Sequence, residues 1–329
     1  MHAIEKHVLF AFPGQGSQYP GMGSDLYHQY AVAQEVYKTA SDVLGYDIAE
    51  LSFQDPENKL NLTEFTQPAL LTHSIACLEV FRDLTDDRLQ PVMTAGHSLG
   101  EYSALVAAGA LSFQSALQLV QKRGELMGAH GEGEMTAFPL DSDTIKPVAE
   151  RFHCAIAGCN LPQQTVIGGR KEDLTLVEHT IKDQFARKRP VRLKTEGAFH
   201  TYYMVRAAQL YRAVLEQAEF ALSDVKVISN FTGTFHSHEP QDVRSALFFQ
   251  LFHPVLWYSN LQTAFADGIR LIVEFGGGIG SATDAAGKRP NLEGMIKKSL
   301  RGTDYKVRYQ SVINSQTLRD TVDAVNGFS

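Results

Sequence analysis

The residues best suited to covalent chemistry lie in the segment Gly96-His97-Ser98-Leu99-Gly100, which has the form G-x-S-x-G. A short apolar strand is predicted before this segment, at 91–96, and a helix directly after it. A serine on a sharp strand-to-helix turn is held out of the backbone at a helix N-terminus, where free N–H groups stabilise a developing oxyanion. The alternative is a chance match in a tight turn, and the flanking strand and helix favour Ser98 as a nucleophile.

A serine nucleophile requires a base, and His200 is the best placed of the 12 histidines. It ends the segment Gly197-Ala198-Phe199-His200, where the chain re-enters its larger part; for any single histidine, a surface or core position is the commoner outcome. A hydrolase-type triad also needs an acid between serine and histidine. Four aspartates fall there and none stands out: Asp141, Asp143, Asp173 and Asp183. A Ser–His dyad is therefore as plausible as a triad.

Arg123 lies on a helix predicted over 112–128. Its planar guanidinium could hold a free carboxylate through two parallel hydrogen bonds. A solvated helix arginine is the commoner alternative, and position alone favours it. The glycine-rich stretch 276–280 lacks the G-x-G-x-x-G arrangement of a dinucleotide loop, and no P-loop sequence is present.

Short apolar strands alternate with helical patterns, which predicts a parallel α/β sheet with crossover helices. The predicted strands are 7–12, 91–96, 225–230 and 270–275, and the predicted helices include 27–45, 68–85, 112–128, 200–219 and most of 241–267. The tail, 302–329, is polar and less patterned. Between these parts lie strands at 134–140, 153–159, 164–169 and 190–195 and helices at 142–152 and 171–186. This βαββαβ order is the ferredoxin-like pattern and predicts a small inserted domain.

Composition narrows the class of protein. The chain has 329 residues, 44% of them hydrophobic and 20% charged, as in ordinary globular proteins. A net charge of −7 disfavours nucleic-acid binding, and no stretch has the apolar length of a membrane span. The three cysteines, Cys77, Cys154 and Cys159, cannot all pair and form no metal-ligand cluster, so we expect no metal and a cytoplasmic location.

Several segments together resemble one family, the malonyl-CoA:acyl carrier protein transacylases, which includes the acyltransferase domains of polyketide synthases. They are Phe12 to Gln18, Gly96 to Glu101, Gln121 to Gly124, Gly197 to His200, Ser229 to Gly233, and Gln250-Leu251 with Pro254, Val255 and Trp257. They follow the family's order and spacing from about residue 7 to about 300. The resemblance implies an α/β-hydrolase-like large subdomain, 1–130 and 198–329, with a ferredoxin-like small subdomain, 131–197, inserted into it.

The resemblance also implies a role for each site residue. Ser98 would be the nucleophile and His200 the general base, oriented by the backbone carbonyl of Gln250 rather than by a carboxylate. The oxyanion hole would be the backbone N–H groups of Gln15 and Leu99. Arg123 would bind the free carboxylate of the acyl group, which reverses the solvated-arginine interpretation. Further residues implied to line the site are His97, Asn160 and Phe199.

The activity implied is transfer of a malonyl group from its coenzyme A thioester to the phosphopantetheine thiol of an acyl carrier protein. No bound cofactor is expected, and a stand-alone enzyme would serve a fatty-acid or polyketide synthase in trans. In the family, Phe199 and Leu99 go with malonyl rather than methylmalonyl, although one methyl group decides only about 1–3 kcal/mol. One departure is Gly276-Gly277-Gly278, where the family usually has Gly-Pro-Gly.

Carrier proteins are acidic, so docking to this acidic chain needs a local basic patch. Five basic residues cluster near the end of the predicted insert: Arg187, Lys188, Arg189, Arg192 and Lys194. A solvated edge strand is an equally good explanation. Two other functions compete with transfer. One is a serine hydrolase that clears acyl chains from carrier proteins, for which Arg123 has no use, and the other is a non-catalytic scaffold.

Overall fold

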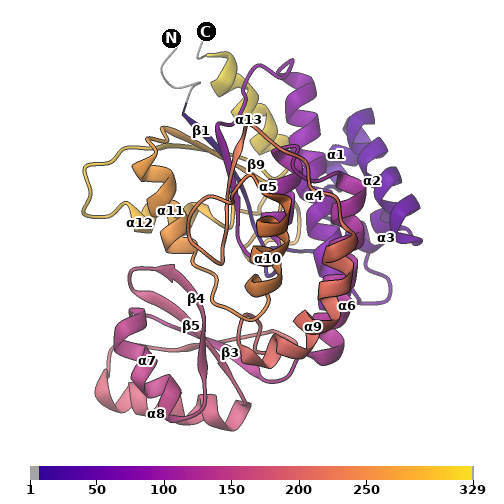
Figure 1. Cartoon of the computed structure of the whole chain (residues 1–329). Coiled ribbons are helices and arrows are strands. Elements are labelled where there is room, and N and C mark those ends of the chain that lie inside the picture. Colours follow the sequence, from indigo (N-terminus) through magenta and orange to yellow (C-terminus); the bar gives the residue numbers. More distant parts are fainter. Residues whose placement is uncertain (1–6, 328–329) are drawn as a thin grey trace.

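The computed structural model describes residues 7–327 and places two separate β-sheets in the chain (Figure 1). The ends of the predicted large subdomain, 1–6 and 328–329, lie outside the described residues. The larger sheet is five-stranded and parallel, in the order β7-β2-β1-β8-β9. Its strands are β1 (Val8–Phe12), β2 (Met93–Gly96), β7 (Lys226–Ile228), β8 (Leu271–Phe275) and β9 (Arg308–Val312). The α/β prediction is confirmed.

Both faces of the parallel sheet are buried, which explains why its central strands are mostly apolar rather than alternating. Thr94 on β2 and Glu274 on β8 are polar residues buried within them. In β1, Phe10 and Phe12 belong to one core cluster, whereas Leu9 and Ala11 belong to the cluster on the opposite face. Helices α11 (Trp257–Ala266) and α12 (Glu293–Ser299) pack on the second of these faces. The first face is covered chiefly by α2 (Ala31–Leu44), α4 (Thr63–Leu84), α5 (Gly100–Ala107), α6 (Phe113–His130) and α9 (Val205–Gln217).

The smaller sheet is antiparallel and four-stranded, in the order β4-β5-β3-β6. Its strands are β3 (Glu134–Phe138), β4 (Ala155–Leu161), β5 (Gln164–Gly169) and β6 (Val191–Leu193). Helices α7 (Ser142–Arg151) and α8 (Lys171–Gln184) complete the βαββαβ unit and cover one face with their own core cluster. The sheet order is that of a ferredoxin-like unit. We propose that this unit is the inserted subdomain, 131–197.

Backbone hydrogen bonds join the small sheet to the rest of the molecule at Val255. Its N–H donates to Ala157 at 3.0 Å and its carbonyl accepts from Cys159 at 2.8 Å, so Val255 pairs with β4. Val255 lies in the loop between α10 (Pro240–Gln250) and α11. The prediction of a mostly helical 241–267 omitted this break, which frees the last carbonyls of α10 for other partners.

Two further differences from the sequence prediction concern local elements. The polar tail forms β9 and an amphipathic helix, α13 (Ser315–Asn326), with Leu318 and Val325 buried. An edge strand with one covered face needs few apolar residues, which is why its pattern is weak. The helix predicted over 27–45 is instead α1 (Ser24–Gln29) and α2, separated at the extended residue Tyr30.

Two short helices had no sequence prediction: α3 (Ile48–Phe53) and α12. The helix predicted over 200–219 is a 3₁₀ turn, η1 (Tyr202–Met204), followed by α9. No helix within 7–327 combines the length and apolar character needed to cross a bilayer.

The loop that departs from the family's Gly-Pro-Gly follows β8 and depends on glycine. Gly277 has a φ of +66° and its N–H donates to Nδ1 of buried His73 at 3.1 Å. Proline supplies neither that dihedral nor an N–H group. Burial lowers the pKa of His73 to about 4, which keeps Nδ1 an acceptor at neutral pH.

Candidate active site

Ser98 occupies the turn between β2 and α5 in a strained left-handed conformation, with a φ of +53°. The glycines on either side are required by close backbone contacts. A Cβ on Gly96 would lie 1.9 Å from the backbone of Gly100, and one on Gly100 would lie 2.2 Å from the carbonyl oxygen of Phe12. The G-x-S-x-G spacing therefore reflects a turn too tight for other side chains. Strain at a non-glycine residue of this kind is typical of functional sites.

His200 faces Ser98 across the turn. Its Nε2 lies 2.7 Å from Ser98 Oγ, and its Nδ1 lies 2.7 Å from the backbone carbonyl oxygen of Gln250. Because a carbonyl only accepts, Nδ1 carries the proton and Nε2 is left to accept from the serine hydroxyl. Burial, and then the charge of Arg123, lowers the pKa of His200 to about 3. The imidazole is therefore neutral at physiological pH.

Arg123 is only 1% exposed, and its guanidinium points at the serine. Nη2 lies 3.2 Å from Ser98 Oγ and 3.0 Å from Oε1 of Gln250, while Nη1 donates to Gln67 at 2.8 Å. All three acceptors are neutral, and Arg123 forms no ion pair with a carboxylate within 7–327. Its Nε has no partner. A buried positive charge without a counter-ion is costly, so this site is suited to an anionic ligand.

Helix α6 can bring Arg123 to this position because it packs very closely on α4. Gly124 lies against the backbone of Thr63, where a Cβ would come within 2.6 Å of the carbonyl oxygen. The hydroxyl of Ser112 caps the helix by accepting from the N–H of Ser115. The glycine after Arg123 is thus part of the positioning of the guanidinium.

The two backbone N–H groups implied to form the oxyanion hole lie on adjacent loops at the carboxyl ends of β1 and β2. The N–H of His97 donates to the carbonyl of Phe12 at 2.9 Å, and a Cβ on Gly14 would touch the His97 carbonyl at 2.3 Å. Gln15 comes directly after Gly14, and Leu99 comes directly after Ser98. Within residues 7–327, neither of their N–H groups donates a hydrogen bond to another protein group.

Two of the remaining predicted lining residues are hydrogen-bonded to each other. Nε2 of His97 lies 2.9 Å from Oδ1 of Asn160 on β4, which connects the serine turn to the small sheet. Burial lowers the pKa of His97. Phe199 is 5% exposed and packs in the large core cluster, where its contribution is to hold the backbone next to His200.

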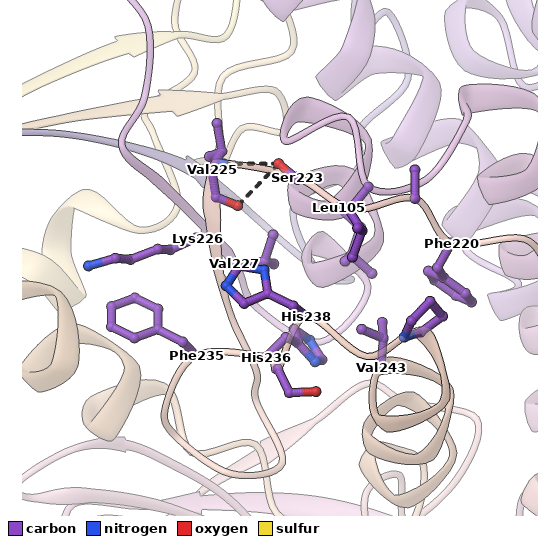
Figure 2. A pocket seen from close by; sticks show the side chains of 15 residues that line it. Leu105, Phe220, Ser223, Val225, Lys226, Val227, Phe235, His236, His238 and Val243 are labelled. Atoms are coloured by element: carbon purple, nitrogen blue, oxygen red, sulfur yellow. Dashed lines mark hydrogen bonds between the residues drawn. The ribbon is translucent and has the colours of Figure 1, made fainter.

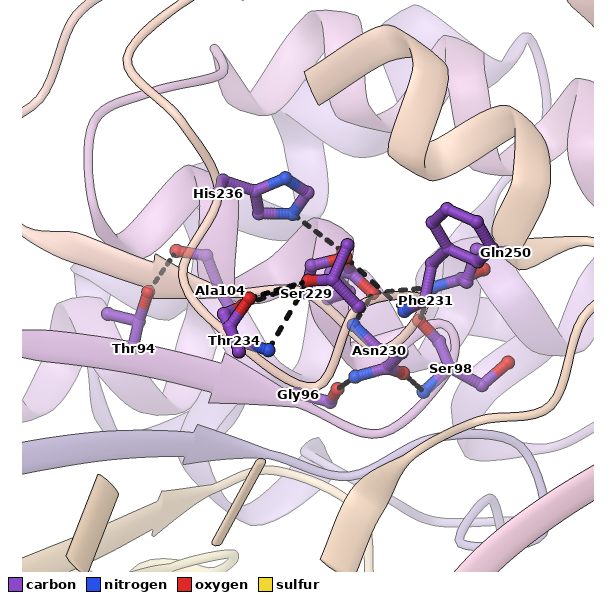
Figure 3. Close-up of polar contacts among 12 residues, drawn as sticks. Thr94, Gly96, Ser98, Ala104, Ser229, Asn230, Phe231, Thr234, His236 and Gln250 are labelled. Atoms are coloured by element: carbon purple, nitrogen blue, oxygen red, sulfur yellow. Dashed lines mark hydrogen bonds and ion pairs between the residues drawn. The ribbon is translucent and has the colours of Figure 1, made fainter. Parts of the chain in front are cut away.

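Four polar residues around the site had no predicted role: Gln67, Glu101, Asn230 and His236. Figure 3 shows Asn230 and His236 beside the serine turn. Asn230 accepts from the N–H of Ser98 and donates to the carbonyl of Gly96 at 2.7 Å, so it bridges the turn. Glu101 and Asn230 lie in the segments of the resemblance, but their partners are far away in the chain. Only their burial distinguishes them from ordinary polar residues, and the burial of a polar residue cannot be recognised from a sequence.

The basic cluster divides into two parts. Arg192 on β6 is engaged by two carboxylates, with Nε 2.9 Å from Glu178 and Nη1 2.5 Å from Glu134. The other four residues, Arg187, Lys188, Arg189 and Lys194, lie at or near the surface. No group of His, Cys, Asp or Glu side chains in the described part of the chain could hold a metal ion.

A parallel α/β sheet with a serine on a strand-to-helix turn and a histidine 2.7 Å from its hydroxyl is the arrangement of proteins that transfer acyl groups through a serine. The family model described as the acyl transferase domain matches residues 9–275. The chain is 39% identical over 303 residues to a malonyl CoA-acyl carrier protein transacylase of Bacillus subtilis (strain 168), covering 89% of this chain and 90% of that protein. The chain thus belongs to the malonyl CoA-acyl carrier protein transacylase family.

Two other proteins match this chain over nearly the whole of their own length. The polyketide biosynthesis malonyl CoA-acyl carrier protein transacylase PksC of Bacillus subtilis (strain 168) is 34% identical over 275 residues, covering 82% of this chain and 93% of that protein. A solved malonyl-transacylase, crystallised with its type II polyketide synthase acyl-carrier protein, is 32% identical with a TM-score of 0.85. It covers 97% of this chain and 100% of the solved one.

Proposed function

We propose that the protein transfers a malonyl group from coenzyme A to the phosphopantetheine thiol of an acyl carrier protein, through an ester on Ser98. The observation that carries this proposal is the buried guanidinium of Arg123, which lies 3.2 Å from the nucleophilic oxygen and lacks a carboxylate partner. A short dicarboxylic acyl group supplies that carboxylate while its thioester carbon lies at Ser98 Oγ. An unsubstituted acyl group leaves the charge unpaired.

In the first half-reaction His200 Nε2 takes the proton of Ser98 Oγ, and the oxygen attacks the thioester carbon. The N–H groups of Gln15 and Leu99 stabilise the oxyanion. The C–S bond then breaks, and the coenzyme A sulfur leaves with the proton from His200. In the second half-reaction the carrier thiol gives its proton to His200 and attacks the ester. Ser98 Oγ leaves and recovers that proton.

Substrate binding also tunes the base. Arg123 is a named cause of the low pKa of His200, second to burial. A malonyl carboxylate bound to the guanidinium offsets that positive charge, so the pKa of His200 rises when the correct substrate is present. The imidazole thereby becomes a better proton acceptor only when the acyl group carries a carboxylate.

The carrier protein belongs to a fatty-acid or polyketide synthase: one relative is named for polyketide biosynthesis, and the name of another gives the carrier protein without a pathway. We propose that four basic residues on either side of β6 bind the acidic carrier: Arg187, Lys188, Arg189 and Lys194. Arg192, on β6 itself, fixes that strand through its ion pairs with Glu134 and Glu178. The three free cysteines are consistent with a reducing compartment such as the cytoplasm.

The test is to incubate the purified protein with malonyl-CoA, with and without phosphopantetheinylated carrier protein, and to follow Ser98 by peptide mass spectrometry. We expect a malonyl adduct on the Ser98 peptide, loss of the adduct on adding carrier, and no adduct in Ser98→Ala. Rapid release of free malonate with little carrier loading would support the hydrolase alternative. No mass gain on wild-type Ser98 would support the scaffold alternative.

A further inference from the structure

Beneath the serine turn lies a carboxylate that the reaction itself does not use. Glu101, in the first turn of α5, is fully buried and receives three hydrogen bonds. Its Oε2 accepts from the N–H of Asn230 at 3.0 Å and from Nε2 of Gln250 at 2.8 Å. Its Oε1 lies 2.7 Å from Nε2 of His236. Three donors compensate the loss of hydration that a buried carboxylate suffers.

Glu101 decides which way the amide of Gln250 faces. A carboxylate only accepts hydrogen bonds, so the NH₂ group of Gln250 must point towards it. The same Nε2 also donates to the carbonyl of Ser98 at 3.0 Å. The amide oxygen is therefore turned towards Arg123, where it accepts from Nη2 at 3.0 Å. With the amide reversed, NH₂ would face the guanidinium, donor against donor.

Glu101 also fixes the residue that bridges the serine turn. Its bond to the N–H of Asn230 holds the backbone from which the Asn230 side chain reaches Ser98 and Gly96. One carboxylate thus orients the two amide side chains that contact Ser98 and Arg123. Figure 3 shows these contacts as dashed lines between His236 on one side and Asn230, Gln250 and Ser98 on the other.

His236 is the outermost member of this chain of contacts. Its side chain is 5% exposed and bonds to Glu101 through Nε2. The imidazole also lines a pocket beside β7, together with Leu105, Val227, His238 and Val243 (Figure 2). A small molecule in this pocket therefore has a route to the imidazole position and, through it, to Glu101.

We infer that Glu101 and His236 form a positioning pair for the acyl-transfer site. Glu101 sets the orientation of Gln250, and with it the selectivity for a carboxylated acyl group, while His236 keeps the carboxylate in place. This inference rests on the proposed function. Neither residue touches the substrate: both act through Gln250, Asn230 and Arg123.

The first test is Glu101→Gln, which keeps the size of the side chain and removes its acceptor-only character. The new amide can present NH₂ to Gln250, so Gln250 loses its fixed orientation. We expect the ratio of malonyl to acetyl loading on Ser98, measured as kcat/KM for each thioester, to fall about tenfold. A purely structural role would lower the melting temperature and slow both substrates equally. An unchanged malonyl-to-acetyl ratio in folded Glu101→Gln overturns the inference.

The second test is His236→Ala, with chemical rescue by added imidazole. We expect a loss of about tenfold in malonyl loading, because Glu101 loses a charged hydrogen bond. Imidazole should restore most of that loss through the enlarged pocket. His238→Ala is the matched control, since His238 lines the same pocket without a bond to Glu101, and it should load at the wild-type rate with or without imidazole. Wild-type loading by His236→Ala, or no rescue by imidazole, contradicts the pair.

Failure of this inference is distinguishable from failure of the proposed function. If wild-type protein loads malonyl and Glu101→Gln keeps its selectivity, only the positioning pair is wrong. If wild-type protein loads no malonyl, the proposed function is wrong. The pair is then still tested by the rate at which phenylmethylsulfonyl fluoride modifies Ser98, which should fall about tenfold in Glu101→Gln through the loosened turn.

Discussion

At the scale of single residues, the site is governed by two opposed electrostatic requirements. A cation must lie beside Ser98 to bind a carboxylate, yet a cation there weakens the base that activates the serine. Both groups are nevertheless buried together, Arg123 at 1% exposure and His200 at 6%. We propose that the substrate resolves the conflict, with the malonyl carboxylate neutralising the guanidinium. Selectivity and activation therefore come from the same charge.

The first prediction concerns Arg123→Ala. Loss of the guanidinium should reduce kcat/KM for malonyl-CoA by about 10- to 100-fold, the usual effect of a hydrogen-bonded charge pair. Acetyl-CoA, which has no carboxylate to bind, should be affected less. Competitive labelling of Ser98 by the two thioesters measures the ratio. Lys122→Ala, at an exposed position on the same helix, should leave it unchanged, and an unaltered ratio in Arg123→Ala would remove that residue from the specificity role.

The second prediction concerns pH. The pKa of His200 is lowered from 6.5 to about 3, so the neutral base persists far below the ordinary titration range of histidine. Modification of Ser98 by phenylmethylsulfonyl fluoride, an uncharged reagent, should therefore proceed at a nearly constant rate from about pH 8 to about pH 5. A decline with a midpoint near the ordinary pKa of histidine would show that His200 is not held neutral in the free enzyme.

At the scale of elements, the parallel sheet carries a second buried carboxylate, on a strand that does not carry the serine turn. Glu274 on β8 accepts from the N–H groups of Asn291 and Leu292, which precede α12, and from the hydroxyl of Tyr309 on β9. It thereby ties three elements together. Burial raises its pKa from 4.5 to about 7, against the effect of these hydrogen bonds.

The third prediction follows from that shift. Because the folded-state pKa exceeds the unfolded value, folded protein holds the extra proton between about pH 5 and about pH 7, and Glu274 stabilises the fold increasingly as pH falls through this range. The free energy of unfolding of wild type, minus that of Glu274→Gln, should rise by about 1–3 kcal/mol between pH 8 and pH 5.5 in urea titrations. Glu172→Gln, at an exposed carboxylate on α8, should show no such trend. A pH-independent difference for Glu274→Gln would contradict the shifted pKa.

At the scale of the whole molecule, the reaction needs two large substrates to reach one buried serine in turn. The serine turn belongs to the parallel sheet, whereas Asn160 and the basic residues near β6 belong to the small sheet. The bond between His97 and Asn160 and the pairing of Val255 with β4 connect the two parts near the site. The basic residues flank β6, at the edge of the small sheet opposite β4, and we propose that a carrier protein docked there reaches Ser98 through its phosphopantetheine arm.

The fourth prediction tests that docking. Reversing the charges of Arg187, Lys188, Arg189 and Lys194 to glutamate should lower kcat/KM for carrier protein about tenfold or more and weaken its dependence on salt. Labelling of Ser98 by malonyl-CoA should stay at the wild-type rate, since none of these residues contacts Ser98, His200 or Arg123. Reversal of four exposed basic residues elsewhere, Lys297, Lys298, Arg301 and Arg319, to glutamate is the matched control. Equal effects of the two reversals would exclude a specific docking site.

Local patterns in the sequence determined the alternation of strands and helices, the βαββαβ insert and the serine turn, because each depends on residues close together in the chain. Glycine spacing together with the flanking strand and helix indicated the turn at Ser98, and the structure shows that only glycine fits at Gly96 and Gly100. The tail was the failure: β9 is stabilised by pairing with β8 rather than by its own apolar residues. Its strand character therefore comes from a neighbour that no local pattern contains.

The partners of buried polar groups were decided only by the tertiary structure. From residue types alone, a solvated Arg123 was the better hypothesis, and the resemblance rather than its position reversed it. The contacts of Glu101 with Asn230, His236 and Gln250 join residues more than a hundred positions apart. Hydrogen bonds and desolvation depend on distance in space, and a linear pattern records neither. The serine could be predicted from its turn, but the network that orients it required the fold.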